Sequence, residues 1–147
     1  MDVIKKISDE KIVDLLTQSV ERENRQLAQT LSLLSEVMER RIHLALGFAS
    51  LFEFCSAKLC LSEGAVYRRT QVAGKIKDYP VLYRAIKESK INLTVASAIC
   101  PHLAKSPCPD EFIGRFFGKT KRQAEEMLID IKGAVPVPRD EIRPVGK

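Results

Sequence analysis

The 147-residue sequence lacks any long hydrophobic run. A helix that crosses a bilayer needs about 20 consecutive apolar residues, so we do not expect this chain to span a membrane. The first ten residues, MDVIKKISDE, also lack the apolar segment of a secretory signal peptide. We therefore expect a cytoplasmic protein with no membrane partner.

Closely spaced metal ligands are missing as well. The four cysteines form no CxxC pair: Cys55, Cys60, Cys100 and Cys108. The two histidines, His43 and His102, lie far apart in the sequence. A structural zinc site usually takes its ligands from tighter pairs. Free cysteines of a cytosolic chain mostly pack as small apolar side chains. We expect four buried thiols, no metal site and no cofactor.

Patterns of catalytic residues are absent too. HEXXH, DXDXDG and GXSXG do not occur, and two histidines do not make an HNH-type metal site. The tripeptide GKT at 118–120 resembles the end of a phosphate-binding loop, but it lacks the preceding glycines and follows a predicted helix instead of a strand. We expect no enzyme activity in this chain and no small-molecule substrate.

Helix-breaking residues are absent from a long stretch of the chain. No glycine or proline occurs between Ile12 and Leu46, and apolar residues recur there at spacings of three, four and seven: Leu16, Val20, Leu27, Leu31, Leu34 and Met38. This pattern predicts a helix over about 9–46, with a bend or break in the polar segment 21–26 and an end at Gly47. No segment alternates like a strand, so the predicted class is all-α.

Shorter helices are predicted for the rest of the chain. About six of them follow the long helix and complete a helical domain over residues 1–132. Ser50 and Ser62 are typical N-cap residues, and they predict a helix-turn-helix-like unit over about 50–77. Residues 133–147 contain three prolines and no periodicity, which is typical of a linker or tail.

Positive charge is concentrated in the second part of the sequence. Residues 1–57 contain 7 Lys and Arg against 9 Asp and Glu, whereas residues 58–122 contain 13 against 5. A cluster of one sign on ordered helices is a candidate phosphate-binding surface. The alternative is a solvated basic face that binds nothing.

The predicted helix from Ser62 to Lys77 is the leading candidate for DNA recognition. Arginine donates two hydrogen bonds to guanine, and glutamine pairs with adenine edges, which suggests groove-facing roles for four residues of this helix: Arg68, Arg69, Gln71 and Lys75. Five further residues are candidates for phosphate contacts: Tyr67, Lys77, Lys119, Lys121 and Arg122. An ordinary amphipathic core helix with basic outer residues has the same pattern. The turn glycine usual in such units is also absent near Cys60.

Four segments carry a resemblance to a known family. They are LLSEVMERRIHLALGFASLFEFC, LSEGAVYRRTQVAGKIKDYP, INLTVASAICPHL and GKTKRQAEEML. In this order, from about Leu31 to Leu128, they resemble the helical N-terminal region of bacterial HNH endonuclease family proteins. The resemblance covers about two-thirds of the chain.

The resemblance implies a helical DNA-engaging or targeting region upstream of a nuclease domain. The family's metal-binding and catalytic histidines lie beyond this region, so none is assigned to a residue here. We expect a non-catalytic DNA-binding module. Two alternatives stay open: a protein-interaction or homodimerisation module that uses the long N-terminal helix, and a fragment of a larger HNH endonuclease.

Overall fold

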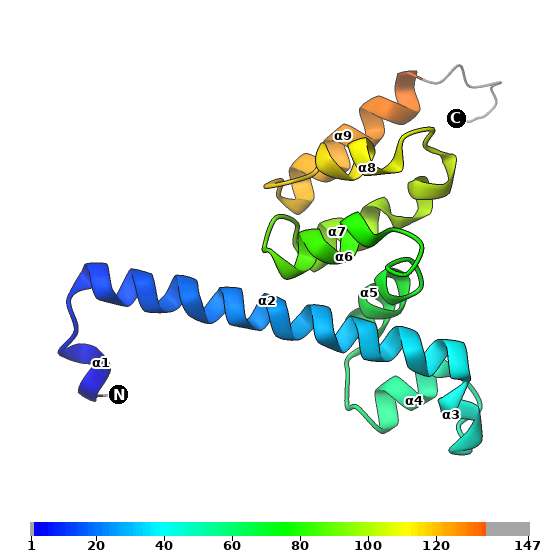
Figure 1. The fold of residues 1–147 in the computed structure, drawn as a ribbon, viewed down its shortest axis with the longest axis horizontal. Helices are drawn as coiled ribbons and strands as arrows, with labels where there is room; N and C mark the ends of the chain where they lie inside the picture. Colours follow the sequence, from blue (N-terminus) through cyan, green and yellow to red (C-terminus); the bar gives the residue numbers. More distant parts are fainter. Residues whose placement is uncertain (1, 135–147) are drawn as a thin grey trace.

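The structure, a computed structural model, describes residues 2–134 and shows only helices within them (Figure 1). The elements are α1 (Asp2–Lys5), α2 (Asp9–Arg40), α3 (Ile42–Ala45), α4 (Leu51–Ala57), α5 (Glu63–Ala73), α6 (Pro80–Lys87), α7 (Leu93–Ile99), the 3₁₀ helix η1 (Cys100–Lys105), α8 (Pro109–Gly114) and α9 (Lys121–Ala134). The all-α prediction is confirmed: one long N-terminal helix packs against several shorter ones.

The long helix differs from its prediction at two places. α2 runs without interruption through the polar segment 21–26, since Glu, Arg and Gln are good helix formers whose side chains can stay in water. The sequence predicted that the helix extends to Leu46, but α2 ends at Arg40. Arg41 adopts a left-handed conformation with φ of 55°, and its N–H bonds back to Met38 at 3.3 Å. The separate helix α3 follows, and Gly47 (φ 93°) comes after it.

The two helices predicted to form a helix-turn-helix-like unit, α4 and α5, each begin with the predicted serine cap. The Ser50 hydroxyl accepts a hydrogen bond from the N–H of Glu53 at 3.1 Å, and that of Ser62 accepts one from Ala65 at 3.3 Å. α5 ends at Ala73, earlier than the predicted Lys77, and turns continue from there to α6.

Cys60 provides the turn conformation for which glycine is usual. Its φ is 56°, a left-handed value that costs a residue with a Cβ about 1–2 kcal/mol. We expect Cys60→Gly to raise the free energy of unfolding by about 0.5–1 kcal/mol, because relief of this strain exceeds the entropy that glycine adds to the unfolded chain. Urea denaturation measures the change. Lys58→Gly is the control: Lys58 has φ of −81°, so this substitution should destabilise, and a destabilised Cys60→Gly would contradict the argument.

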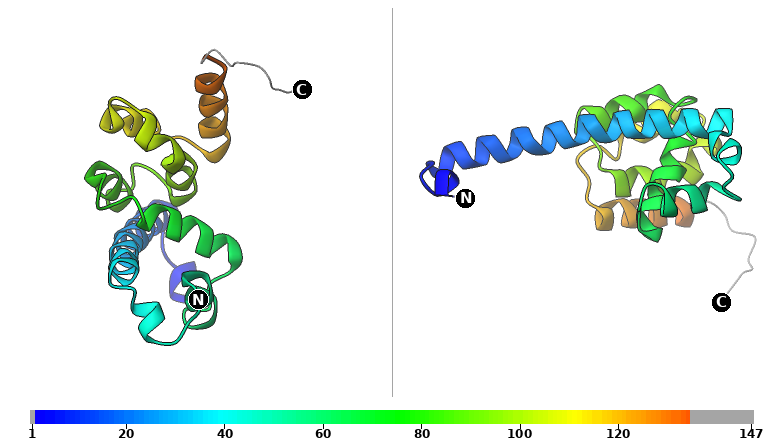
Figure 2. Two further views of the ribbon diagram at one scale, coloured as in Figure 1. Left: turned by 90° about the vertical axis from the view of Figure 1, so that its right-hand side faces the viewer. Right: turned by 90° about the horizontal axis from the view of Figure 1, so that it is seen from below.

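The core lies on the C-terminal half of α2 and between the helices that follow. α2 contacts α5 and α6, while α7 contacts both α5 and α9 (Figure 2). The most deeply buried large side chains are Leu31, Val72, Leu82, Ile86, Val95, Ile99, Leu103, Ile113 and Phe116. The first half of α2 has no such cover and projects from the body as an arm.

The cysteines divide into two kinds. Cys55 and Cys100 are buried as expected, and burial raises the pKa of both thiols, that of Cys100 to about 11. Cys60 and Cys108 are exposed, contrary to the expectation, because each lies in a loop ahead of a helix. All four are free, and the described residues contain no group of three metal-ligating side chains.

Two further findings concern the C-terminal end of α9 and the capacity of the helices to span a membrane. α9 continues through Gly133 to Ala134, so the predicted tail loses its first two residues to a helix. Residues 135–147, the remainder of that tail, lie outside the described residues. Within residues 2–134, no helix is both long enough and apolar enough to cross a bilayer.

Candidate nucleic-acid interface

α5 lies in the middle of the domain and has a narrow exposed face. It contacts α2, α4 and α7, and it buries Val66, Val72 and Ala73. Tyr67 is the most exposed large side chain on the opposite side, at 61%. Its hydroxyl oxygen accepts a hydrogen bond from Nε2 of Gln71 at 3.4 Å. These two polar groups therefore lie together on the solvent side of the helix.

Arg68 lies beside this exposed face. Its guanidinium folds back over Gly64, where Nη1 would be only 3.2 Å from a Cβ. Because Gly64 has no side chain, the Arg68 guanidinium can occupy the space beside it. Arg68 itself is half-exposed.

Arg69 lies on the inward side of α5, not on the outward face predicted for it. It is three residues from Val66 and from Val72, so it shares their side of the helix. Nη1 donates a hydrogen bond to the carbonyl of Ala65 at 3.4 Å. Burial, and secondly the charge of Arg68, lower the pKa of the Arg69 guanidinium. This group is therefore half-buried beside a second positive charge.

Among the described residues, no carboxylate forms an ion pair with Arg68 or Arg69. Within residues 2–134, the ion pairs involve other cations and leave Arg68 and Arg69 without an acidic partner. A half-buried cation is stable when an anion or a set of acceptors compensates its desolvation. The pair is therefore suited to bind an anionic group from outside the domain.

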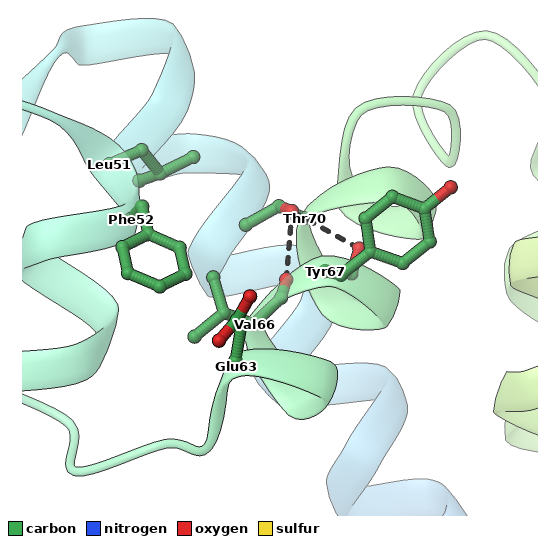
Figure 3. A pocket seen from close by; sticks show the side chains of 6 residues that line it. All are labelled: Leu51, Phe52, Glu63, Val66, Tyr67 and Thr70. Carbon is green, nitrogen blue, oxygen red and sulfur yellow. Dashed lines mark hydrogen bonds between the residues drawn. The ribbon is translucent and has the colours of Figure 1, made fainter.

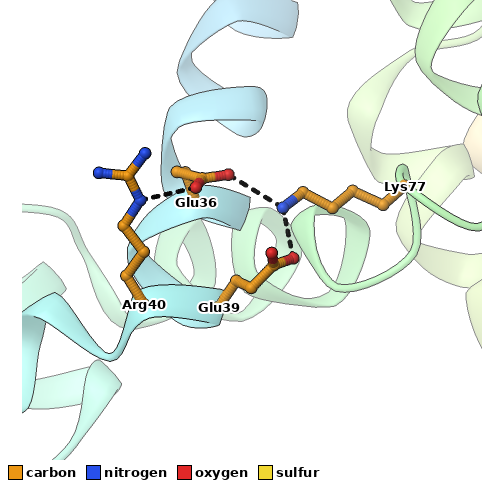
Figure 4. Close-up of polar contacts among 4 residues, drawn as sticks. All are labelled: Glu36, Glu39, Arg40 and Lys77. Atoms are coloured by element: carbon orange, nitrogen blue, oxygen red, sulfur yellow. Dashed lines mark hydrogen bonds and ion pairs between the residues drawn. The ribbon is translucent and has the colours of Figure 1, made fainter.

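Lys77 has a different environment from the other candidate residues. Its Nζ lies 3.0 Å from Oε1 of Glu36 and 2.5 Å from Oε1 of Glu39, and Glu36 also pairs with Arg40 (Figure 4). Hydrogen bonds from Lys77 and then Arg40 lower the pKa of Glu36, and those to Glu39 and Glu36 raise the pKa of Lys77. The charge of Lys77 is already neutralised by α2, so a phosphate would compete with two carboxylates.

Lys75 and the basic residues near α9 are distributed over other parts of the body. Lys75 is half-buried and lies near Cys100, where its charge favours the thiolate. Lys119, Lys121 and Arg122 lie at the start of α9, which contacts α7. Arg122 has Glu126 at 3.7 Å. Six of the nine candidate residues thus lie in α5 or the turns just after it, and three lie at or just before the start of α9; α7 contacts both helices (Figure 1).

The start of α9 is held by backbone and side-chain hydrogen bonds. Thr120 and Gln123 form a reciprocal cap, with the N–H of each donating to the other's side-chain oxygen at 2.9 and 3.1 Å. The N–H of Gly118 donates to the carbonyl of Lys90 at 2.8 Å. These bonds fix the backbone on which Lys119 and Lys121 are presented.

A shallow apolar groove between α4 and α5 is unsuited to phosphate. It has a volume of about 270 Å³ and is lined by Leu51, Phe52, Glu63, Val66, Tyr67 and Thr70. Figure 3 shows the Glu63 carboxylate beside the groove and the Tyr67 ring pointing away from Phe52. The charge of Glu63 repels an anion, so the candidate phosphate site is restricted to the arginine side of α5.

Comparison of the chain with protein-family models, with curated proteins and with solved structures finds no match. The resemblance to the helical region of HNH endonuclease family proteins stays a prediction.

Proposed function

We propose that the chain is a non-catalytic DNA-binding module in which α5 contacts the phosphate backbone. The observation that carries the proposal is the adjacent pair Arg68 and Arg69, which has no acidic partner among the described residues. Each guanidinium group would donate charge-assisted hydrogen bonds to a phosphate, and the phosphate at Arg69 would compensate the partial burial of that side chain. Arginine is the side chain best matched to this geometry.

The geometry favours phosphate contact over base reading at these two positions. Arg69 is half-buried on the inward side of α5, so its side chain does not extend freely toward a groove. Tyr67 and Gln71 are the groups on the solvent side of α5 that can reach a sugar or a base. Lys77 is left out of the proposed surface because Glu36 and Glu39 bind it.

The excess of positive charge over residues 58–122 supports the same proposal, since it attracts a polyanion to this part of the chain. Lys119, Lys121 and Arg122 supply a second set of phosphate contacts from α9. The proposal places the protein in the cytoplasm of a bacterial cell, where it meets chromosomal DNA. In a longer protein of the HNH family, the module would hold DNA for the nuclease domain.

The test is a fluorescence-anisotropy titration of a duplex of about 20 base pairs at about 50 mM and about 200 mM salt. With about five phosphates contacted, two by the arginine pair and three from the start of α9, affinity should fall about 500-fold over this range, because each contact releases counterions. Binding that does not change with salt, or no binding at the lower salt concentration, would contradict the proposal.

A further inference from the structure

The groove between α4 and α5 has apolar walls that the fold holds in place. Leu51 is partly buried against the core, and Val66 is 2% exposed. Phe52 lies across the groove from Val66 and is 51% exposed (Figure 3). At the turn between the two helices, the N–H of Leu61 donates a hydrogen bond to the carbonyl of Cys55 at 3.2 Å. The groove is therefore pre-formed, as ligand sites usually are.

Glu63 is the only charged residue among the described residues that line the groove. Its carboxylate lies beside the groove in the first turn of α5, where the helix dipole favours negative charge (Figure 3). Among residues 2–134, no ion pair involves Glu63. The hydroxyl of Thr70, also in the lining, already donates to the carbonyl of Val66 at 2.8 Å. A carboxylate only accepts hydrogen bonds, so the groove selects a ligand that carries an N–H donor.

A positive group lies beside the same turn of α5. The Arg68 guanidinium folds over Gly64, the residue after Glu63, yet it forms no ion pair with the Glu63 carboxylate. This turn therefore presents a cation and a separate acceptor to the same ligand. A nucleotide has the complementary groups: a phosphate and, one sugar away, a flat base whose edge carries amino donors. A basic apolar peptide would suit Glu63, but Arg68 and Arg69 would repel it.

The size of the groove restricts the ligand to a single base. Its volume of about 270 Å³ is just below the range of about 300–1,000 Å³ that is typical of sites for drug-sized molecules. A base that stays paired and stacked within a duplex cannot enter such a groove, so the base must be unpaired. The exposed ring of Phe52 offers the aromatic surface on which proteins that bind single strands place a base.

We propose that the groove between α4 and α5 binds one unpaired cytosine of single-stranded DNA, with the adjoining phosphate on Arg68. The inference rests on the proposed function, because it extends the phosphate site to the base beside it. Cytosine is the smallest base with an amino group, and its N4 amino group donates well to an acidic side chain such as Glu63. Thymine has the acceptor O4 at this position, which the carboxylate repels. Phe52 contacts the face of the base.

The test is a fluorescence-anisotropy titration of the full chain with two single strands of about 12 nucleotides, one all cytosine and one all thymine. At about 50 mM salt, wild type should bind the cytosine strand about tenfold more tightly. Equal binding of the two strands overturns the inference and leaves the groove to a peptide or a second copy of the chain.

Glu63→Gln tests the role of the carboxylate. The glutamine amide can accept from the amino group of cytosine and can donate to O4 of thymine, so the preference should fall to within about twofold. The ratio of the two affinities cancels the general gain in DNA binding that follows the loss of a negative charge. A tenfold preference that survives this substitution overturns the assignment of Glu63.

Phe52→Ala tests whether the base lies in the groove. It should weaken binding of the cytosine strand about tenfold, because the aromatic surface is lost. The matched control is Leu44→Ala: Leu44 is 49% exposed on α3 and does not line the groove, so affinity should stay within about twofold of wild type. Equal losses in the two variants overturn the groove as the site. Circular dichroism checks that every variant is folded.

A duplex of the same length distinguishes this inference from the proposed function. Duplex binding that weakens with salt, together with equal affinity for the two single strands, overturns only the base in the groove. If neither duplex nor single strand binds at about 50 mM salt, both the inference and the proposed function are contradicted.

Discussion

Leu31→Ala lowers the free energy of unfolding by about 2–5 kcal/mol. Leu31 is fully buried on the side of α2 that meets α5 and α6. Truncation removes apolar contacts and leaves a cavity where the long helix attaches to the body. Because a domain of this size has about 5–15 kcal/mol of total stability, the loss is a large part of it.

Leu33→Ala is the matched control for this prediction. Leu33 is two residues further along the same helix and is 60% exposed, so its truncation should change stability by less than about 0.5 kcal/mol. Urea denaturation of both variants gives the comparison. Equal losses at the two positions would show that α2 does not pack on the body through the face that bears Leu31.

Replacing Arg68 and Arg69 together with alanine should weaken binding of duplex DNA at least about 100-fold at low salt. Each guanidinium in the proposed complex donates charge-assisted hydrogen bonds to a phosphate, worth about 1.5–3 kcal/mol. Two such contacts are lost at once. Fluorescence anisotropy under the conditions that detect wild-type binding measures the change.

A second double variant controls for the removal of two charges. Arg84 and Lys87 are exposed basic residues on α6, and Arg84→Ala with Lys87→Ala lowers the net charge equally. Its affinity should stay within about threefold of wild type, since it loses only long-range attraction. Circular dichroism checks that both proteins are folded. The single variant Arg69→Lys should bind duplex DNA more tightly than the double alanine variant and less tightly than wild type. Lysine keeps the positive charge but lacks the planar guanidinium donors.

The helical class could be predicted from local sequence because the signals are local. A stretch without glycine or proline, apolar residues at helical spacing and serine caps all depend on near neighbours. The burial of the stripe on α2 could not be predicted in this way. Leu16 and Leu31 both belong to the predicted apolar pattern, yet Leu16 is 62% exposed and Leu31 is fully buried. The difference is made by α5 and α6, which reach only the second half of the helix.

The backbone conformations of two turns also could not be predicted from local sequence patterns. Arg41 and Cys60 adopt left-handed conformations that sequence rules assign to glycine. Packing of the helices on either side holds these residues in a conformation that the isolated chain would disfavour. The bend or break predicted in the polar segment 21–26 was wrong: α2 is continuous there, since solvent exposure alone does not end a helix.

The sequence could predict which basic residues lie in the candidate site, but not the directions or the ion-pair partners of their side chains. The sequence places Arg68 and Arg69 side by side, but their helical positions differ by 100°, which puts Arg69 toward Val66 and Val72. Lys77 is removed from the proposed surface by two glutamates about 40 residues earlier in the chain. No local spacing indicates such an ion pair, because only the fold brings α2 beside the end of α5.

The salt dependence of DNA binding, compared between wild type and the Arg68→Ala, Arg69→Ala double variant, tests the central proposal most directly. The slope of log affinity against log salt concentration changes by about 0.9 for each phosphate contact. The proposal predicts a slope shallower by about 2 in the variant, and an unchanged slope in the Arg84→Ala, Lys87→Ala control. Equal slopes in wild type and the Arg68→Ala, Arg69→Ala variant would contradict the assignment of the arginine pair to DNA phosphates.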